Sequence, residues 1–249
     1  MKLKLHAGAG AWYALFNNGT MHYEGNRDNM TDYLKKHEQF EIEVLKLLSD
    51  NQLLNKVTFG GGTMMRLCIG LNRYSVDLDF FSKETFGKED FKKIEKLIAG
   101  KYKVLDSYEK FYTRIVEFKS PAYPRKLKLE IRKFFPEDRF ETDVKIAFSK
   151  FSNEQVRVTT FSDEQSWKNK VKAIMERREI RDAYDLEFMY KKGIGNWKAL
   201  DPEKKIGILK ILDAFSKNDF KVKLGSLLDK EERDYYNEFG FKILKNALT

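Results

Sequence analysis

The chain of 249 residues contains only one cysteine, four prolines and three histidines, and it has no long run of apolar residues. Because Cys68 is the single cysteine, no internal disulfide can form, which fits a reducing compartment. A transmembrane helix needs about 20 consecutive apolar residues, and the sequence offers no such run. The opening residues, MKLKLHAGAGAWYALF, have an apolar part too short and too broken by glycine and histidine for a signal peptide. We therefore expect a cytoplasmic protein with no membrane partner.

The composition is that of a folded, basic protein. Hydrophobic residues make up 42% of the chain and aromatic residues 14%, which excludes general disorder. The formal net charge of +9 indicates a polyanionic partner such as a nucleic acid or a nucleotide phosphate. Since 34% of the residues are charged, an ordinary solvated lysine-rich surface explains the excess about equally well.

The pattern along the chain predicts an α/β (α+β) fold in three parts. Residues 1–32 are rich in glycine and asparagine without a clear period and form an extension of unclear role, residues 33–160 form the α/β core, and residues 161–249 form a mostly helical C-terminal domain. Strands are expected at 57–59, 76–81, 102–105, 112–118, 126–135 and 156–161, and helices at 33–50, 64–69, 91–98, after Ser162, at 182–190 and from Pro202 to the end.

Two aspartates, Asp77 and Asp79, lie one residue apart inside an apolar strand. Successive strand side chains alternate between faces, so both carboxylates point to one side and Leu78 points to the other. Two like charges this close raise each other's pKa unless a cation neutralises them, and Mg²⁺ takes oxygen ligands of this kind. The spacing therefore predicts a metal-binding pair.

A third carboxylate, Glu130, occurs in the later strand LKLEIR, on the same face as Lys128 and Arg132. It is a candidate for completing a site in which metal ions stabilise the attacking and leaving oxygens of a displacement at phosphorus. The alternative is a solvent-facing edge strand with alternating charge.

Glycines 60 to 62 precede an expected helix, about 15 residues before the aspartate pair. A glycine turn at a helix N-terminus exposes N–H groups that suit a phosphate, and Thr63 can add its hydroxyl. Many such turns use glycine only because it adopts positive φ.

Cationic candidates lie further on, where Lys170 and Arg177 share one flank of a helix and can face a triphosphate. For each alone, a solvated surface role is the alternative. Asp182 and Asp185 can orient Arg181, activate a hydroxyl, or simply favour the helix dipole.

Four segments in this order, GGGTMMRL, RYSVDLDF, LKLEI and WKNKVKAIMERREIRDAYDL, resemble the AbiEii/AbiGii type of nucleotidyltransferase toxin, a branch of the DNA polymerase β-like superfamily. The resemblance covers about residues 38 to 192. It implies a polymerase β-like core with a mixed sheet flanked by helices, followed by a helical unit.

The resemblance also implies a role for each matching residue. Gly61, Gly62 and Thr63 would hold the nucleotide phosphates, with Arg66 and Ser75 close by. Asp77 and Asp79 would bind Mg²⁺, Lys170 would contact the triphosphate, and Asp182 would be the aspartate of the last segment, with Asp185 behind it and Arg177 and Arg181 in support. Glu130 stands where many polymerase β-like enzymes have aspartate, so its assignment as a metal ligand follows the family least closely.

The expected function is that of a Mg²⁺-dependent nucleotidyltransferase that moves a nucleoside monophosphate from an NTP to an acceptor hydroxyl and releases pyrophosphate. The resemblance implies a tRNA 3′ end or another RNA as acceptor, a place in a toxin–antitoxin or phage-defence system, and a cognate antitoxin. The alternatives are a protein or small-molecule acceptor, or an RNA-binding module without catalytic activity.

Overall fold

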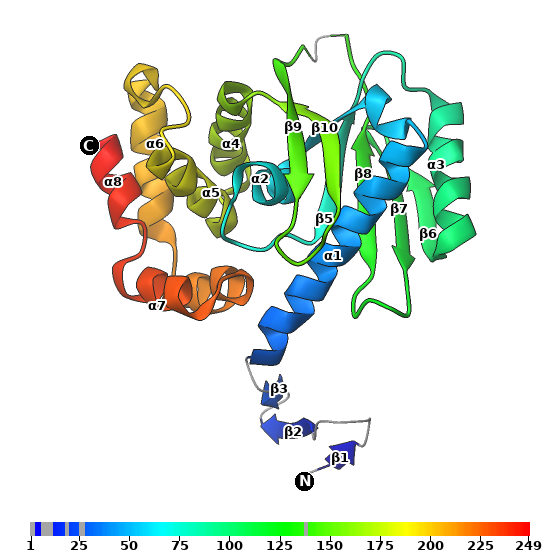
Figure 1. Cartoon of the computed structure of the whole chain (residues 1–249). Coiled ribbons are helices and arrows are strands. Elements are labelled where there is room, and N and C mark those ends of the chain that lie inside the picture. The colour runs from blue at the N-terminus through cyan, green and yellow to red at the C-terminus, as the bar shows by residue number, and fades with distance from the viewer. Residues whose placement is uncertain (1–2, 6–11, 18–19, 25–27, 137–138) are drawn as a thin grey trace.

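The computed structural model describes the backbone of residues 3–5, 12–17, 20–24, 28–136 and 139–249, and side chains from residue 32 onward within these ranges. Its centre is a mixed seven-stranded sheet with the order β6-β7-β8-β5-β4-β10-β9 (Figure 1). The pairs β5–β8 and β4–β10 are parallel, and the other neighbouring pairs are antiparallel. The strands are β4 (Val57–Gly60), β5 (Asp77–Ser82), β6 (Lys103–Glu109), β7 (Thr113–Lys119), β8 (Leu127–Arg132), β9 (Thr142–Phe148) and β10 (Gln155–Phe161).

Helices flank the sheet and form the C-terminal part of the chain. Three of them pack against the strands: α1 (Asp28–Asp50), α2 (Gly61–Ile69) and α3 (Lys88–Lys101). The C-terminal helices gather at one side of the sheet in Figure 1: α4 (Asp163–Arg177), α5 (Ile180–Lys191), α6 (Pro202–Ala214), α7 (Lys230–Phe239) and α8 (Lys242–Leu248). Short 3₁₀ turns lie at Leu53–Lys56, Trp197–Ala199 and Gly225–Leu227, and a π-helical turn at Asp219–Leu224. These features confirm the predicted α/β class with a mixed sheet and a helical C-terminal part.

Alternating side chains explain why β5 is a central strand. Leu78 is fully buried and Phe80 is 2% exposed, whereas Asp77 and Asp79 are half-buried on the other face. Burying a Leu or Phe side chain contributes roughly 1.5–3 kcal/mol, so the apolar face fixes the register of the strand. The two carboxylates are thereby held on the opposite face.

One apolar core joins the sheet to the C-terminal helices. It includes Phe40 of α1, Leu129 of β8, Ile174 of α4 and Leu244 of α8, none of which is exposed to solvent. The position of side chains on α4 and α5 relative to the sheet is therefore set by buried packing. Among the described residues, no helix is long and apolar enough to cross a membrane.

The structure adds detail to the N-terminal extension and moves the start of the first helix. Within residues 1–32, β1 (Leu3–Leu5), β2 (Trp12–Asn17) and β3 (Thr20–Glu24) form a three-stranded antiparallel sheet, and α1 already begins at Asp28. The expected boundary between residues 32 and 33 therefore falls inside a helix. Strands of three to six residues are too short for their alternation to be recognised in a glycine-rich sequence.

The structure also differs from the prediction at β9, β8 and α2, and by smaller shifts of boundary in other elements. Strand β9 was not expected, because it is an edge strand whose Val144, Ile146 and Phe148 are each about half exposed and give no buried pattern. Strand β8 ends at Arg132 instead of 135. Helix α2 begins at Gly61 instead of Met64, since glycine has a low helix propensity and hides the start.

Candidate active site

Carboxylates from two neighbouring strands meet on one face of the sheet. Strands β5 and β8 are parallel, and their register places Asp77 beside Lys128 and Asp79 beside Glu130. Both strands alternate strictly, with Leu129 and Ile131 buried on the opposite face from Glu130. Glu130 therefore lies next to the aspartate pair.

Lys128 is a cation of the chain itself that faces these carboxylates. Its Nζ lies 3.4 Å from Asp77 Oδ2 and 3.2 Å from Glu130 Oε2. Burial raises the pKa of Asp79 to about 6, and the charges of Asp77 and Glu130 add to this effect, while Lys128 and Lys170 partly oppose it. The negative charge around Asp79 is therefore only partly neutralised by the protein.

This arrangement suits a hard divalent cation. Mg²⁺ is commonly bound by one or two carboxylates and completes its coordination with water and substrate phosphates. Asp77 and Asp79 supply such a pair of oxygen donors from one strand face. Among the described residues, no group of three or more His, Cys, Asp or Glu side chains is placed to hold a metal ion together. Glu130 as a third ligand therefore stays a prediction.

The glycine turn closes directly onto these residues. Gly60 pairs with Asp79 across β4 and β5, and Gly61 begins α2 with a left-handed φ of +74°. A Cβ at Gly61 would lie 2.2 Å from Asp79 Oδ2, and a Cβ at Gly62 would lie 2.7 Å from Arg73 Nη2 and 2.8 Å from Ser75 Oγ. Glycine is needed here because a carboxylate, a guanidinium and a hydroxyl all approach the backbone closely.

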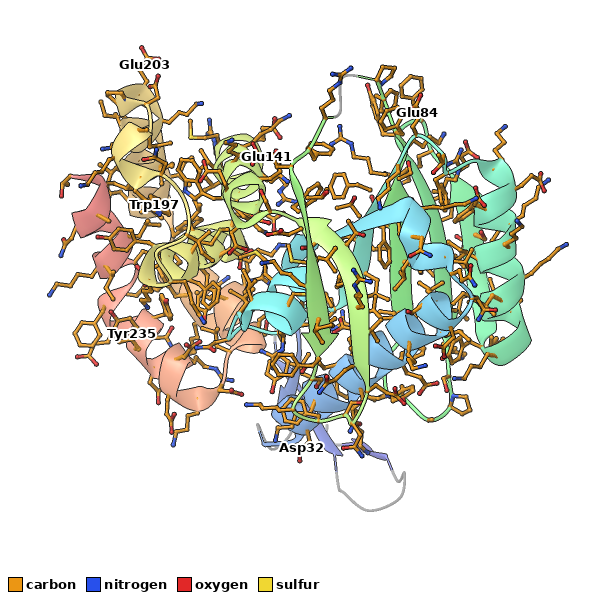
Figure 2. All side chains as sticks on the ribbon, turned by 45° about the horizontal axis from the view of Figure 1, so that its top comes forward. Asp32, Glu84, Glu141, Trp197, Glu203 and Tyr235 are labelled. Carbon is orange, nitrogen blue, oxygen red and sulfur yellow. The ribbon has the colours of Figure 1, made fainter. Side chains whose placement is uncertain are left out.

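Helix α4 brings Lys170 to the same region. The Ser162 side chain accepts a hydrogen bond from the Gln165 amide (3.0 Å), so the predicted helix start is confirmed. The Ser162 amide in turn donates to the carbonyl oxygen of Glu141 (2.9 Å), which Figure 2 labels beside α4. These contacts fix the N-terminal end of the helix that carries Lys170.

Lys170 belongs to a buried charge network with α5. Its Nζ lies 2.5 Å from Asp185 Oδ2 and 3.2 Å from Asp182 Oδ1. Arg73 donates two hydrogen bonds to the carboxylate of Asp185, from Nε (2.6 Å) and from Nη2 (2.7 Å). Burial alone would raise the pKa of Asp185, but the charges and hydrogen bonds of Arg73 and Lys170 outweigh it and hold the pKa below its usual value.

Asp182 and Asp185 thus orient Lys170 and two arginines, Arg73 and Arg177. The cation suggested by the sequence, Arg181, has a different partner. Asp182 is 1% exposed and also accepts from Arg177 Nη2 (2.9 Å), whereas Arg181 pairs with Glu179 (2.6 Å). One oxygen of Asp182, Oδ2, is buried without a hydrogen-bond partner. Lys170 is consequently held between two aspartates of α5, and Arg177 lies half exposed next to it.

Arg73 was not among the predicted site residues, although it lies in the recognised segment RYSVDLDF. It is 3% exposed and links that segment to α5, 112 residues away in the chain. An arginine four residues before an aspartate pair is unremarkable in sequence, and only its partner Asp185 reveals its role.

Two buried residues, His37 and Thr63, donate hydrogen bonds to the backbone at the start of β5. The Nε2 of His37 on α1 donates to the carbonyl oxygen of Val76 (2.9 Å), and Thr63 Oγ1 donates to the carbonyl oxygen of Asp77 (2.6 Å). Burial lowers the pKa of His37, with Arg125 adding to the effect and the bond to Val76 opposing it. The hydroxyl of Thr63, expected at the phosphates, donates to the backbone of Asp77, and its contact with a phosphate stays a prediction.

Arg66 is likewise engaged away from the carboxylates. It pairs with Glu38 of α1, donates to the carbonyl oxygens of Leu71 (3.2 Å) and Asn72 (2.6 Å), and stacks on Tyr74. The structure therefore does not bring Arg66 to the aspartate pair.

A cavity of about 840 Å³ lies over the site. Its lining includes Gly61, Asp79, Glu130, Lys170 and Arg177 from the predicted set. The lining also includes Tyr112, Thr113 of β7, Arg132 of β8, and the rings of Phe81, Phe140 and Phe161. A cavity with acidic side chains at its floor, a glycine turn and a lysine at one side is large enough for a nucleotide.

The mixed sheet, the paired aspartates and the glycine turn define a nucleotidyltransferase. Among solved structures, JHP933 from Helicobacter pylori resembles the chain with a TM-score of 0.51 at 20% identity, covering 89% of this chain and 94% of that one. A putative nucleotidyltransferase from H. pylori matches with a TM-score of 0.49 at 18% identity, covering 90% and 95%. The search of curated proteins gives no match.

The family follows from the sequence match. The model of the AbiEii nucleotidyl transferase toxin family, type IV toxin–antitoxin system, matches residues 43–239. The chain belongs to this family, which confirms the resemblance seen in the four segments and makes the protein a nucleotidyltransferase toxin by family. The family implies an NTP substrate and a cognate antitoxin.

Proposed function

We propose that this protein transfers a nucleoside monophosphate from an NTP to a hydroxyl at the 3′ end of an RNA, with tRNA as the leading acceptor, in a Mg²⁺-dependent reaction. The observation that carries the proposal is the single cavity lined by Asp79, Glu130, Gly61 and Lys170. A role in phage defence follows if the toxin acts on the RNA of an infected cell.

The reaction is a displacement at the α-phosphorus. A bond forms from the acceptor oxygen to the α-phosphorus, the bond from that phosphorus to the bridging oxygen breaks, and pyrophosphate leaves. The hydroxyl proton passes to a carboxylate, for which Glu130 lies beside Asp79. Mg²⁺ held by Asp77 and Asp79 would neutralise charge on the phosphate oxygens. Positioning and charge neutralisation supply most of the rate enhancement in reactions of this class.

The protein's own groups divide this work. The N-terminus of α2 at Gly61 and Gly62 offers N–H groups and a positive helix dipole to the phosphates. Lys170 faces the cavity with 12% of its side chain exposed and supplies positive charge for the leaving pyrophosphate, with Arg177 at the rim. Arg73 and Asp185 act through Lys170 and the glycine turn as positioning residues.

The test is incubation of the purified protein with each of four α-³²P-labelled NTPs, Mg²⁺ and total tRNA. We expect labelled tRNA from the wild type and none from Asp77→Asn, while Asp106→Asn, an exposed aspartate on β6, retains activity. Label on protein or on a small molecule instead of tRNA would contradict the RNA acceptor. Equal label from Asp77→Asn would contradict the role of the aspartate pair.

A further inference from the structure

An aromatic cluster extends from Tyr112, which lines the cavity, and has no part in the chemistry described above. Phe111 and Tyr112, in the turn between β6 and β7, are 75% and 59% exposed. Their rings contact each other with centroids 4.6 Å apart, and Phe135 lies 5.5 Å from Tyr112 and 6.5 Å from Phe111. We call Phe111, Tyr112 and Phe135 the aromatic platform. Exposed apolar clusters of this kind mark binding surfaces.

The platform is held rigidly although it is exposed. The Lys110 amide donates to the carbonyl oxygen of Thr113 (2.7 Å) and closes the turn. The Lys133 amide donates to the carbonyl oxygen of Tyr112 (2.8 Å), and the Lys133 side chain donates to that of Lys110 (2.7 Å) and pairs with Glu109 (2.6 Å). The rings are therefore presented on a backbone fixed to the end of β8.

The order of the strands separates Tyr112 of the platform from the glycine turn. Strand β4, which leads into the glycine turn, lies on one side of β5, whereas β8 and β7 lie on the other. Along the strands, Asp79 pairs with Glu130, and Thr113 pairs with Arg132 two residues further on. Tyr112 and Gly61 therefore line opposite sides of the cavity.

An in-line displacement places the attacking and leaving oxygens on opposite sides of the phosphorus. If the phosphates lie at Gly61 and Lys170, the acceptor hydroxyl approaches from the side of Glu130. Arg132 lies two residues beyond Glu130 on β8 and pairs with Thr113, which follows Tyr112, and all three residues line the cavity.

We propose that the aromatic platform stacks the nucleobases at the 3′ end of a single-stranded nucleic-acid acceptor and thereby positions the terminal hydroxyl at Glu130. This inference rests on the proposed function for the side of approach. Stacking on aromatic rings accepts any base and needs an unpaired strand, and the net charge of +9 favours its phosphates. A protein acceptor has no such flat rings in its backbone.

The test compares Phe111→Ala/Tyr112→Ala with the wild type by fluorescence anisotropy, without NTP or Mg²⁺. The probe is a 5′-fluorescein-labelled 12-nucleotide single-stranded RNA, with a DNA of the same sequence beside it to distinguish the two strands. Losing a stacked base typically weakens binding about 5- to 150-fold, and we expect a rise in Kd in this range. Tyr112→Phe keeps the ring and should restore the wild-type Kd at that position.

Two controls separate stacking from folding. Phe239 on α7 is 46% exposed and contacts Tyr235, which Figure 2 labels on the C-terminal part. The variant Phe239→Ala therefore removes a partly exposed ring elsewhere and should leave Kd unchanged. A probe whose two 3′-terminal nucleotides are abasic should bind the wild type as weakly as the intact probe binds the double variant. The double variant should then show no further loss with the abasic probe.

The outcomes distinguish this inference from the proposed function. Equal Kd values for wild type and double variant overturn the platform, even if nucleotide transfer to RNA is observed. Platform-dependent binding without any transfer to RNA supports the platform and overturns the proposed reaction. In transfer assays, the double variant should raise the KM for RNA while leaving the KM for NTP unchanged, and an equal rise in both would contradict the assignment.

Discussion

Replacing Gly61 by alanine tests the geometry of the site most directly, because Gly70 provides a matched control. Gly61 has φ +74° and Gly70 has φ +79°, so alanine at either position pays the same left-handed backbone cost of about 1–2 kcal/mol. A Cβ at Gly70 meets nothing within 4 Å, whereas a Cβ at Gly61 would lie 2.2 Å from Asp79 Oδ2. The two variants therefore differ in the clash with the carboxylate.

The size of the effect follows from that contact. Cβ atoms do not approach other atoms closer than 3.0 Å, so the Asp79 carboxylate or the glycine turn must move by at least about 0.8 Å in Gly61→Ala. A misplacement of about 1 Å in an active site can cost about 100-fold in rate. We therefore expect Gly61→Ala to lose about two orders of magnitude in nucleotide transfer, and Gly70→Ala to stay near wild type.

The assay measures initial rates with an α-³²P-labelled NTP, together with the thermal midpoint of each variant with and without Mg²⁺. In the metal-free form Gly61→Ala should lose more stability than Gly70→Ala, because the clash with Asp79 adds to the backbone cost that both variants share. Gly61→Ala should also show a smaller stabilisation by Mg²⁺, because one ligand has moved. Equal activity of the two variants would refute the close approach of Asp79 to the glycine turn as a functional feature.

Three further predictions concern charge. Mg²⁺ should raise the thermal midpoint of the wild type, and Asp77→Asn/Asp79→Asn should abolish that shift, so a shift that survives in a melting assay would contradict this metal site. Arg73→Met removes the two hydrogen bonds of the guanidinium to the buried carboxylate of Asp185 and should lower the free energy of unfolding by about 3–5 kcal/mol. Arg177→Met, at a half-exposed pair, should change the free energy of unfolding by at most about 1 kcal/mol, and urea titrations measure both values. Because the pKa of His37 is lowered in the folded protein, its contribution to stability is fully present above its ordinary value of about 6.5 and declines below it by at most about 1.4 kcal/mol per pH unit. Urea midpoints between pH 7.5 and 5.5 should therefore fall more for wild type than for His37→Gln, and parallel curves would count against this role.

The elements of the core could be predicted where one face is buried. The strand around Asp77 and Asp79 alternates because Leu78 and Phe80 enter the core, and the capped start of α4 is a local pattern. Strand β9 could not be found in this way, because its apolar side chains stay half exposed at the edge of the sheet. Residues 1–32 contain strands that are too short to show a period.

The candidate site divides in the same way. The sequence by itself determined the chemistry: the spacing of the two aspartates, the glycine turn and the four family segments are all local, and each needs only neighbouring residues to be recognised. Only the tertiary structure decided the partners. Asp185 meets Arg73 across 112 residues, and Thr63 of α2, which packs against β5, donates its hydroxyl to the backbone of Asp77. Contacts between distant segments depend on how helices and strands pack, and no local pattern encodes which buried charge will face which.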